Sequence, residues 1–323
     1  MPGNMLEDLV NGLRASRGVA HKGDIAAVVS ALGIAGAESA VPVGDDCAAI
    51  PQGDGWLLLA IEGFINEFVA KDPWFAGWCG VMVNVSDIYA MGGRPVAVVD
   101  AAWSESAEAM QPILQGMAEA SRAYGVPVVG GHSNARSAQN QLAVAILGRA
   151  QRLLTSFDAR PGDVLLAAID LRGAYREPYP HWNAATGAPP ERLRGDLEIL
   201  PALAEDGLCR AAKDISQAGV LGTALMLLEC SGVGAVIEVD AVPRLATVEA
   251  QRWLLSAFPS YGFLLAAPPA HVEEIRRRFK ARGLACEAIG RCDDTRRLRL
   301  RQGGSEQLAW NLAEQPLLGC GPH

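Results

Sequence analysis

Residues 84–95 read Asn84-Val85-Ser86-Asp87-Ile88-Tyr89-Ala90-Met91-Gly92-Gly93-Arg94-Pro95. They close an apolar segment that starts at Pro73, and that segment predicts one long helix over residues 73–91. Asp72 can cap this helix at its start, and the glycines and Pro95 end it. The expected helix is apolar nearly all round, so its polar residues need an explanation.

Asn84 and Asp87 are three positions apart, and they therefore share one face of the expected helix. A bare charge inside such an apolar helix costs too much free energy, so Asp87 must be paired, bound to a metal, or turned to a cavity. Two interpretations stay open at this point. Asp87 is either a metal ligand or a structural residue that caps a neighbouring element.

Elements on either side of this helix predict a mixed α/β protein. The first half predicts two strands around a turn in 41–62, strands at 95–103, 126–129 and 141–147, and a helix over 107–124. The second half predicts strands near 164–169, 235–239, 262–267 and 285–290, and helices near 196–206, 219–230, 247–256 and 270–282. The polar segment at 155–162 predicts two domains, residues 1–155 and 156–323.

Size and composition agree with a compact two-domain protein. The chain has 323 residues and 34.0 kDa, half of its residues are hydrophobic, and no run is long and apolar enough to span a bilayer. The N-terminus shows no secretory signal, which predicts a cytoplasmic location. Seven cysteines without a CxxC pair indicate reduced thiols. A net charge of −8 argues against general nucleic-acid binding.

Two further acidic clusters lie on small-residue turns. Adjacent carboxylates in Gly44-Asp45-Asp46 could hold a hard cation, although an ordinary Gly-Asp turn is the alternative. Asp214 and Ser216 precede the apolar helix expected from residue 219. A helix N-terminus offers free N–H groups to phosphate, and Asp214 could carry a metal beside it. The alternative is that Asp214 or Ser216 is simply the N-cap.

A fourth cluster, Gly130-Gly131-His132, follows an expected strand, and its glycines would let a ligand approach the backbone. His132 is either a ligand contact or a turn histidine. The chain contains neither GxxxxGK[ST] nor a well-placed GxGxxG, so a P-loop and a Rossmann dinucleotide site are both unsupported.

Residues 172–194 predict a long loop that contacts a phosphoryl acceptor, with a mobile surface loop as the alternative. The loop has no evident role in a core, and its side chains offer stacking faces and anion donors. These side chains are Tyr175, Tyr179, His181, Trp182, Arg172, Arg176 and Arg192.

Together, these clusters resemble the superfamily of aminoimidazole ribonucleotide (AIR) synthase over nearly the whole chain. The superfamily also contains thiamine-monophosphate kinase, selenophosphate synthetase and the hydrogenase maturation factor that dehydrates a carbamoyl thiol. The resemblance rests on residues 44–50, 84–95, 129–132 and 214–219. It implies an AIR-synthase-like fold with an N-terminal sheet domain that dimerises and binds ATP, and a C-terminal α/β domain.

The resemblance also implies roles for individual residues, with Mg and ATP as cofactors. The implied metal residues are Asp45, Asp46, Glu62, Asp87 and Asp214, and the implied catalytic residues are Asp45 and Asp214. The implied nucleotide-binding residues are Gly44, Asn84, Asp87, Gly130, Gly131, His132 and Ser216.

Two acidic positions of the thiamine-monophosphate kinase pattern are replaced in this chain, by His132 and by Gln217. The expected function is a Mg-dependent, ATP-using phosphotransferase of that kinase type, which acts on a small metabolite as a homodimer. The alternatives are a cyclising synthase like AIR synthase and a non-catalytic nucleotide-binding subunit. The hydrogenase factor ends in a reactive cysteine, whereas Cys320 here is followed by Gly321-Pro322-His323.

Overall fold

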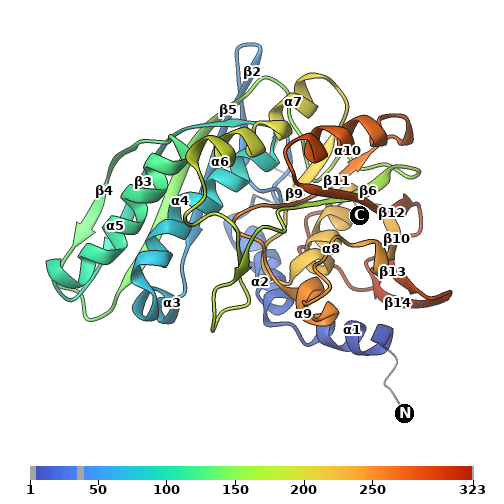
Figure 1. Ribbon diagram of the computed structural model, residues 1–323, viewed down its shortest axis with the longest axis horizontal. Helices are drawn as coiled ribbons and strands as arrows, with labels where there is room; N and C mark the ends of the chain where they lie inside the picture. Colours follow the sequence, from blue (N-terminus) through green and yellow to red (C-terminus); the bar gives the residue numbers. More distant parts are fainter. Residues whose placement is uncertain (1–4, 35–39, 322–323) are drawn as a thin grey trace. The chain divides into compact units, whose positions relative to one another are not determined.

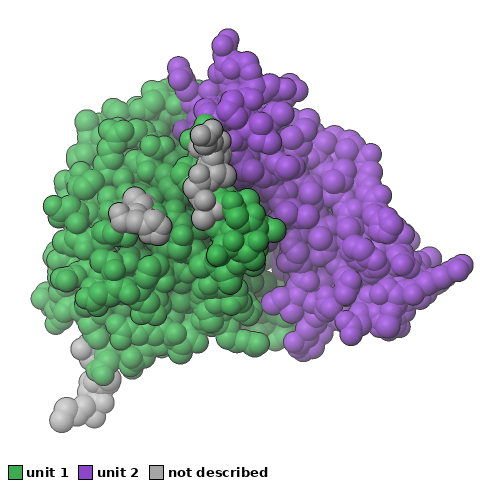
Figure 2. Space-filling view, turned by 180° about the vertical axis from the view of Figure 1, so that it is seen from behind, with its two compact units in different colours: residues 1–45, 154–184, 203–323 green, residues 46–153, 185–202 purple. Residues whose placement is uncertain are grey.

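The computed structural model describes residues 5–34 and 40–321. These residues form two compact units, which have different colours in Figure 2. Unit 1 holds the described residues of 1–45, 154–184 and 203–323, and unit 2 holds 46–153 and 185–202. One change of unit, at 153/154, falls near the predicted division at 155/156. The other changes of unit were not expected. The described residues before 46 belong to unit 1 with most of the C-terminal half, and residues 185–202 belong to unit 2.

Unit 2 is built on a five-stranded sheet in the order β1-β2-β5-β3-β4. Its strands are β1 (Ala48–Gln52), β2 (Gly55–Gly63), β3 (Arg94–Trp103), β4 (Val128–Asn134) and β5 (Gln141–Ala150). The predicted hairpin is confirmed, because β1 and β2 are antiparallel and Gln52 pairs with Gly55 across the turn. Only the β3–β4 pair of this sheet is parallel.

The long helix expected over residues 73–91 is α4 (Pro73–Ala90). Asp72 caps it as predicted, because its side chain accepts a hydrogen bond from the Phe75 N–H at 3.4 Å. The predicted helix over 107–124 is α5 (Ala107–Tyr124). Unit 2 also contains α3 (Asn66–Lys71) and α6 (Pro190–Leu197).

Glycines let α4 lie directly on the sheet. A Cβ atom at Gly80 would stand 2.8 Å from Val144 Cγ2, and one at Gly148 would stand 2.6 Å from Ile88 Cγ2. Val144 and Gly148 lie on the same side of β5, so α4 covers that face. Figure 1 shows α4 and α5 side by side along the sheet.

Unit 1 is built on a seven-stranded sheet in the order β14-β13-β10-β12-β6-β11-β9. The predicted strands in this half are present as β6 (Val164–Ile169), β10 (Gly234–Glu238), β11 (Gly262–Ala267) and β12 (Ala285–Asp293). The predicted helices are present as α7 (Ile199–Glu205), which crosses the unit boundary, α8 (Gly219–Ser231), α9 (Ala250–Leu255) and α10 (Val272–Ala281). Sequence reasoning missed α1 (Met5–Arg14), α2 (Arg17–Leu32), β9 (Ala211–Asp214), β13 (Arg297–Gln302) and β14 (Ser305–Asn311).

The segment expected to be an acceptor loop belongs partly to the core of unit 1, so that expectation is wrong for Trp182. This residue starts β8 (Trp182–Asn183), which pairs with β7 (Ala174–Tyr175). Its side chain is 2% exposed and packs edge-on against Trp253 with ring centroids 4.9 Å apart. Its Nε1 donates to the Asp170 carbonyl at 2.7 Å. Trp182 therefore fills the core of this unit and offers no stacking face to a ligand.

Among the described residues, no helix is long and apolar enough to cross a membrane.

Candidate functional site

The polar face predicted on the long helix lies inside unit 2. Asn84 is 0% exposed and Asp87 is 6% exposed, although α4 is otherwise almost wholly apolar. Asn84 Nδ2 donates to the Gly80 carbonyl at 2.8 Å. Asn84 Oδ1 is buried and accepts no hydrogen bond from any residue that the structure describes. A buried acceptor without a donor is costly, which favours a ligand or an ion at this position.

Asp46 lies close to this face. A carboxylate oxygen of Asp46 and one of Asp87 lie within 4.8 Å of each other, both in unit 2. Two like charges at this separation repel, and a cation between them would remove the repulsion. Carboxylate and amide oxygens are also the donors that Mg²⁺ prefers. The carboxylates of Asp46 and Asp87 therefore fit a hard divalent cation, and the Asn84 oxygen, three positions before Asp87 on α4, is a further hard donor.

Asp45 lies in unit 1, where Ser156 orients its carboxylate. Ser156 Oγ donates to Asp45 Oδ1 at 2.6 Å, and the Ser156 backbone N–H donates to Asp45 Oδ2 at 2.8 Å. Two hydrogen bonds to one carboxylate fix its orientation. Sequence reasoning missed Ser156, because the polar segment 155–162 that contains it has only the pattern of a domain boundary.

The glycine pair Gly130-Gly131 does not follow a strand as expected, because both residues lie within β4. Every residue of this edge strand is exposed. A Cβ atom at Gly130 would meet nothing within 4 Å, so space for a ligand lies beside the backbone. His132 faces Trp103, with ring centroids 5.9 Å apart. Its contact with nucleotide stays a prediction.

Asp100 is a second residue that sequence reasoning missed. It faces Gly131 across the β3–β4 pair, where a Cβ atom on the glycine would stand 2.3 Å from Asp100 Oδ1. Partial burial raises the pKa of the Asp100 carboxyl. The sequence does contain a signal for Asp100, because its carboxylate interrupts the apolar run from Val96 to Ala102.

Glu62 lies near the end of β2 and is exposed. Asp214 ends β9 in unit 1 and is half-buried. Neither Asp214 nor Ser216 caps α8, because Ala218 is the N-cap and makes no side-chain cap bond. The capping alternative is therefore wrong. The metal roles of Glu62 and Asp214 and the phosphate role of Ser216 stay predictions.

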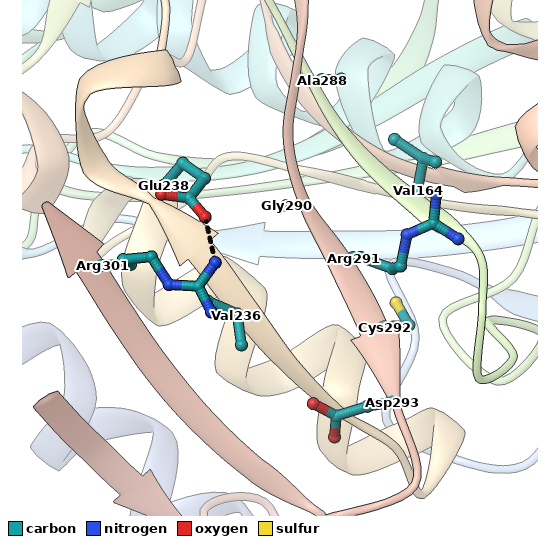
Figure 3. A pocket seen from close by; sticks show the side chains of 9 residues that line it. All are labelled: Val164, Val236, Glu238, Ala288, Gly290, Arg291, Cys292, Asp293 and Arg301. Carbon is teal, nitrogen blue, oxygen red and sulfur yellow. Dashed lines mark hydrogen bonds and ion pairs between the residues drawn. The ribbon is translucent and has the colours of Figure 1, made fainter. Parts of the chain in front are cut away.

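Unit 1 also carries a hollow of about 540 Å³ on its sheet, shown in Figure 3. Small apolar residues form its floor. On one side, Arg301 Nη1 donates a hydrogen bond to Glu238 Oε1 at 2.8 Å. None of the predicted site residues lines it. The hollow is lined by Val164, Val236, Glu238, Ala288, Gly290, Arg291, Cys292, Asp293 and Arg301.

Models of one protein family match both halves of the chain. Residues 44–150 match the family described as "AIR synthase related protein, N-terminal domain", and residues 179–303 match its C-terminal domain. An uncharacterized protein of Synechocystis sp. is 49% identical over 98% of this chain and 98% of its own length. The thiamine-monophosphate kinase of Pyrococcus abyssi is 28% identical over 75% of this chain and 82% of its own length.

Solved structures agree at the level of the fold. The Thermotoga maritima PurL structure with ADP is 22% identical with a TM-score of 0.70, and the match covers 86% of this chain and 46% of that one. This chain therefore spans about half the length of that relative. The AIR-synthase-like fold predicted from the sequence is confirmed, and the chain belongs to the AIR synthase-related family.

Proposed function

We propose that this protein is a Mg-dependent, ATP-using phosphotransferase that acts on a small metabolite. The proposal rests on the close pair of carboxylates Asp46 and Asp87, together with the buried Asn84 oxygen three positions before Asp87 on α4. Such a set of hard oxygen donors suits a cation that is shared with phosphate oxygens. When bound, Mg²⁺ would bridge phosphate oxygens and offset the charge that develops during transfer.

The chain's own residues would orient the ion and the phosphates. Asp87 and Asn84 are fixed by the buried helix, so their oxygens need little reorganisation when they bind. Open space beside Gly130 leaves room for a ligand against the backbone. The catalytic roles that the resemblance implies for Asp45 and Asp214 are part of this proposal.

Relatives support the proposal in two ways. One curated relative is named a thiamine-monophosphate kinase, and others are named selenide, water dikinase. The PurL of T. maritima has been solved with ADP and with ATP. Kinase names and nucleotide complexes favour ATP chemistry.

The test is ATP turnover by the purified protein with a panel of phosphorylated and heterocyclic metabolites. We expect Mg-dependent ADP formation with one acceptor class, and loss of that turnover in Asp46→Asn. A phosphorylated product supports the phosphotransferase, whereas free phosphate and a cyclised product support a synthase. Tight Mg-ATP binding without turnover on any acceptor would support the nucleotide-binding subunit instead.

We also propose that the protein is a homodimer that pairs through the uncovered face of the unit 2 sheet. Ile61 pairs in register with Ala145, and Ala145 pairs with Val99, so these side chains share the face opposite α4. Ile61 is 69% exposed and Val99 is 42% exposed. A contiguous apolar face of this kind marks an interaction surface.

Light scattering tests the dimer at micromolar concentration. We expect twice the chain mass of 34.0 kDa for the parent and a shift to monomer for Ile61→Arg. The matched control is Leu308→Arg, which adds the same charge at a residue that is 43% exposed on β14 of unit 1. A parent that is monomeric yet binds Mg-ATP would overturn this part of the proposal.

A further inference from the structure

Three consecutive residues at the end of α8 each hold a segment that is distant in sequence. They are Glu229, Cys230 and Ser231, and all their contacts described below lie within unit 1. The segments they hold meet at Gly44 and Asp45. None of the three residues belongs to the predicted site.

Glu229 anchors the C-terminal segment 317–321, which we call the strap. Glu229 is 3% exposed, and its carboxylate accepts hydrogen bonds from the backbone N–H groups of three consecutive strap residues. The distances are 2.6 Å from Leu317, 2.9 Å from Leu318 and 2.7 Å from Gly319. A buried charge is tolerated only when it is satisfied in this way. The strap is therefore firmly attached to α8.

The strap packs on the turn that carries Asp45. Gly44 has a φ of +128°, which favours glycine. A Cβ atom at Gly44 would stand 2.7 Å from Cys320 Cβ and 3.5 Å from Cys230 Sγ. Cys230 Sγ also donates to the Gly44 carbonyl at 3.7 Å. Gly44 is thus enclosed between the strap and α8, and no larger residue fits there.

Ser231 acts on the same turn through Ser156. Its Oγ donates to the Ser156 carbonyl at 2.6 Å and accepts from the Ala159 N–H at 3.0 Å. Ser156 in turn gives both of its donors to the Asp45 carboxylate. The hydroxyl of Ser231 therefore fixes the residue that orients Asp45.

We infer that Glu229 and Ser231 are positioning residues, which hold the Gly44–Asp45 turn in the geometry that Mg-nucleotide binding needs. The inference rests on the proposed function, because it gives Asp45 a role at the metal. Residues that orient metal ligands typically change metal affinity or activity by about 10- to 100-fold when they are mutated. A purely structural role would lower stability and leave metal affinity unchanged.

The experiment compares Ser231→Ala and Glu229→Gln with a matched control, Ser260→Ala. Ser260 Oγ also bridges two backbone groups in unit 1, because it donates to the Trp182 carbonyl at 3.1 Å and accepts from the Ala184 N–H at 2.9 Å. Two readouts are taken on the full chain. One is the Mg²⁺ concentration that gives half-maximal ATP binding, and the other is hydrogen exchange of the amides in residues 44–46.

We expect the half-maximal Mg²⁺ concentration to rise about 10- to 100-fold in both variants, with faster exchange at the turn. Ser260→Ala should lower stability but change neither the half-maximal Mg²⁺ concentration nor the exchange at the turn. Ser231→Thr keeps a hydroxyl and should therefore return the half-maximal Mg²⁺ concentration to that of the parent. Unchanged Mg²⁺ dependence in Ser231→Ala would overturn the inference even if exchange is faster. A parent that does not bind Mg-ATP overturns the proposed function, and the exchange result then decides by itself whether α8 holds the turn.

Discussion

Replacing Asp87 by Asn separates a metal site from a structural role, because the two predict opposite changes in stability. The substitution keeps the shape of the side chain and removes one of two neighbouring charges. At the 4.8 Å limit between the Asp46 and Asp87 oxygens, the repulsion is about 3.5 kcal/mol for an effective dielectric constant of about 20. Relief of this repulsion offsets the favourable contacts that Asp87 loses, so metal-free Asp87→Asn should melt at or a few degrees above the melting temperature of the metal-free parent.

The same substitution should remove stabilisation by the ligand. Mg-ATP should raise the melting temperature of the parent, since binding to the native state stabilises it by mass action. We expect little or no rise in Asp87→Asn. Thermal scans in EDTA and in Mg-ATP measure both effects on the same samples. A metal-free variant that melts below the parent, together with an unchanged rise in Mg-ATP, would refute the assignment and favour a structural Asp87.

Three further predictions concern residues outside this pair. Trp182→Ala should lower the free energy of unfolding in urea by about 3–5 kcal/mol and leave the ATP affinity of the folded protein unchanged. Weaker ATP binding without lost stability would restore the acceptor-loop interpretation. Burial lowers the pKa of His181, so the stability it contributes is present above its unfolded pKa of about 6.5 and is lost as pH falls through its folded pKa. His181→Gln should flatten that acid slope in urea titrations, and an unaltered slope would contradict this. His132→Asp should lower the Mg²⁺ requirement for ATP binding, whereas an identical requirement would remove His132 from the site.

The sequence predicted the elements with strong local signals. Asp72, Pro73 and the glycines after Met91 bound α4 because capping and helix termination depend on near neighbours. Asn84 and Asp87 were identifiable because polar residues inside an apolar helix are costly. In contrast, α1 and α2 were missed, although α1 buries Leu6, Leu9 and Leu13 on one face.

Other features depend on contacts between distant residues and have no local signature. Trp182 lies in a stretch rich in proline and glycine, and only its packing on Trp253 makes it a core residue. Likewise, Glu229 appears from the sequence as a helix residue, and its three hydrogen bonds to the strap require the fold. The assignment of residues before 46 to unit 1 is a tertiary property of the same kind.

The most direct test of the central claim is isothermal titration of ATP into the purified protein, with Mg²⁺ and with EDTA, for the parent and for Asp46→Asn. We predict measurable ATP binding by the parent in Mg²⁺, loss of most of that binding in EDTA, and weak binding by Asp46→Asn under both conditions. ATP binding that is equally tight in EDTA and in Asp46→Asn would contradict the claim that these carboxylates hold a metal-nucleotide complex.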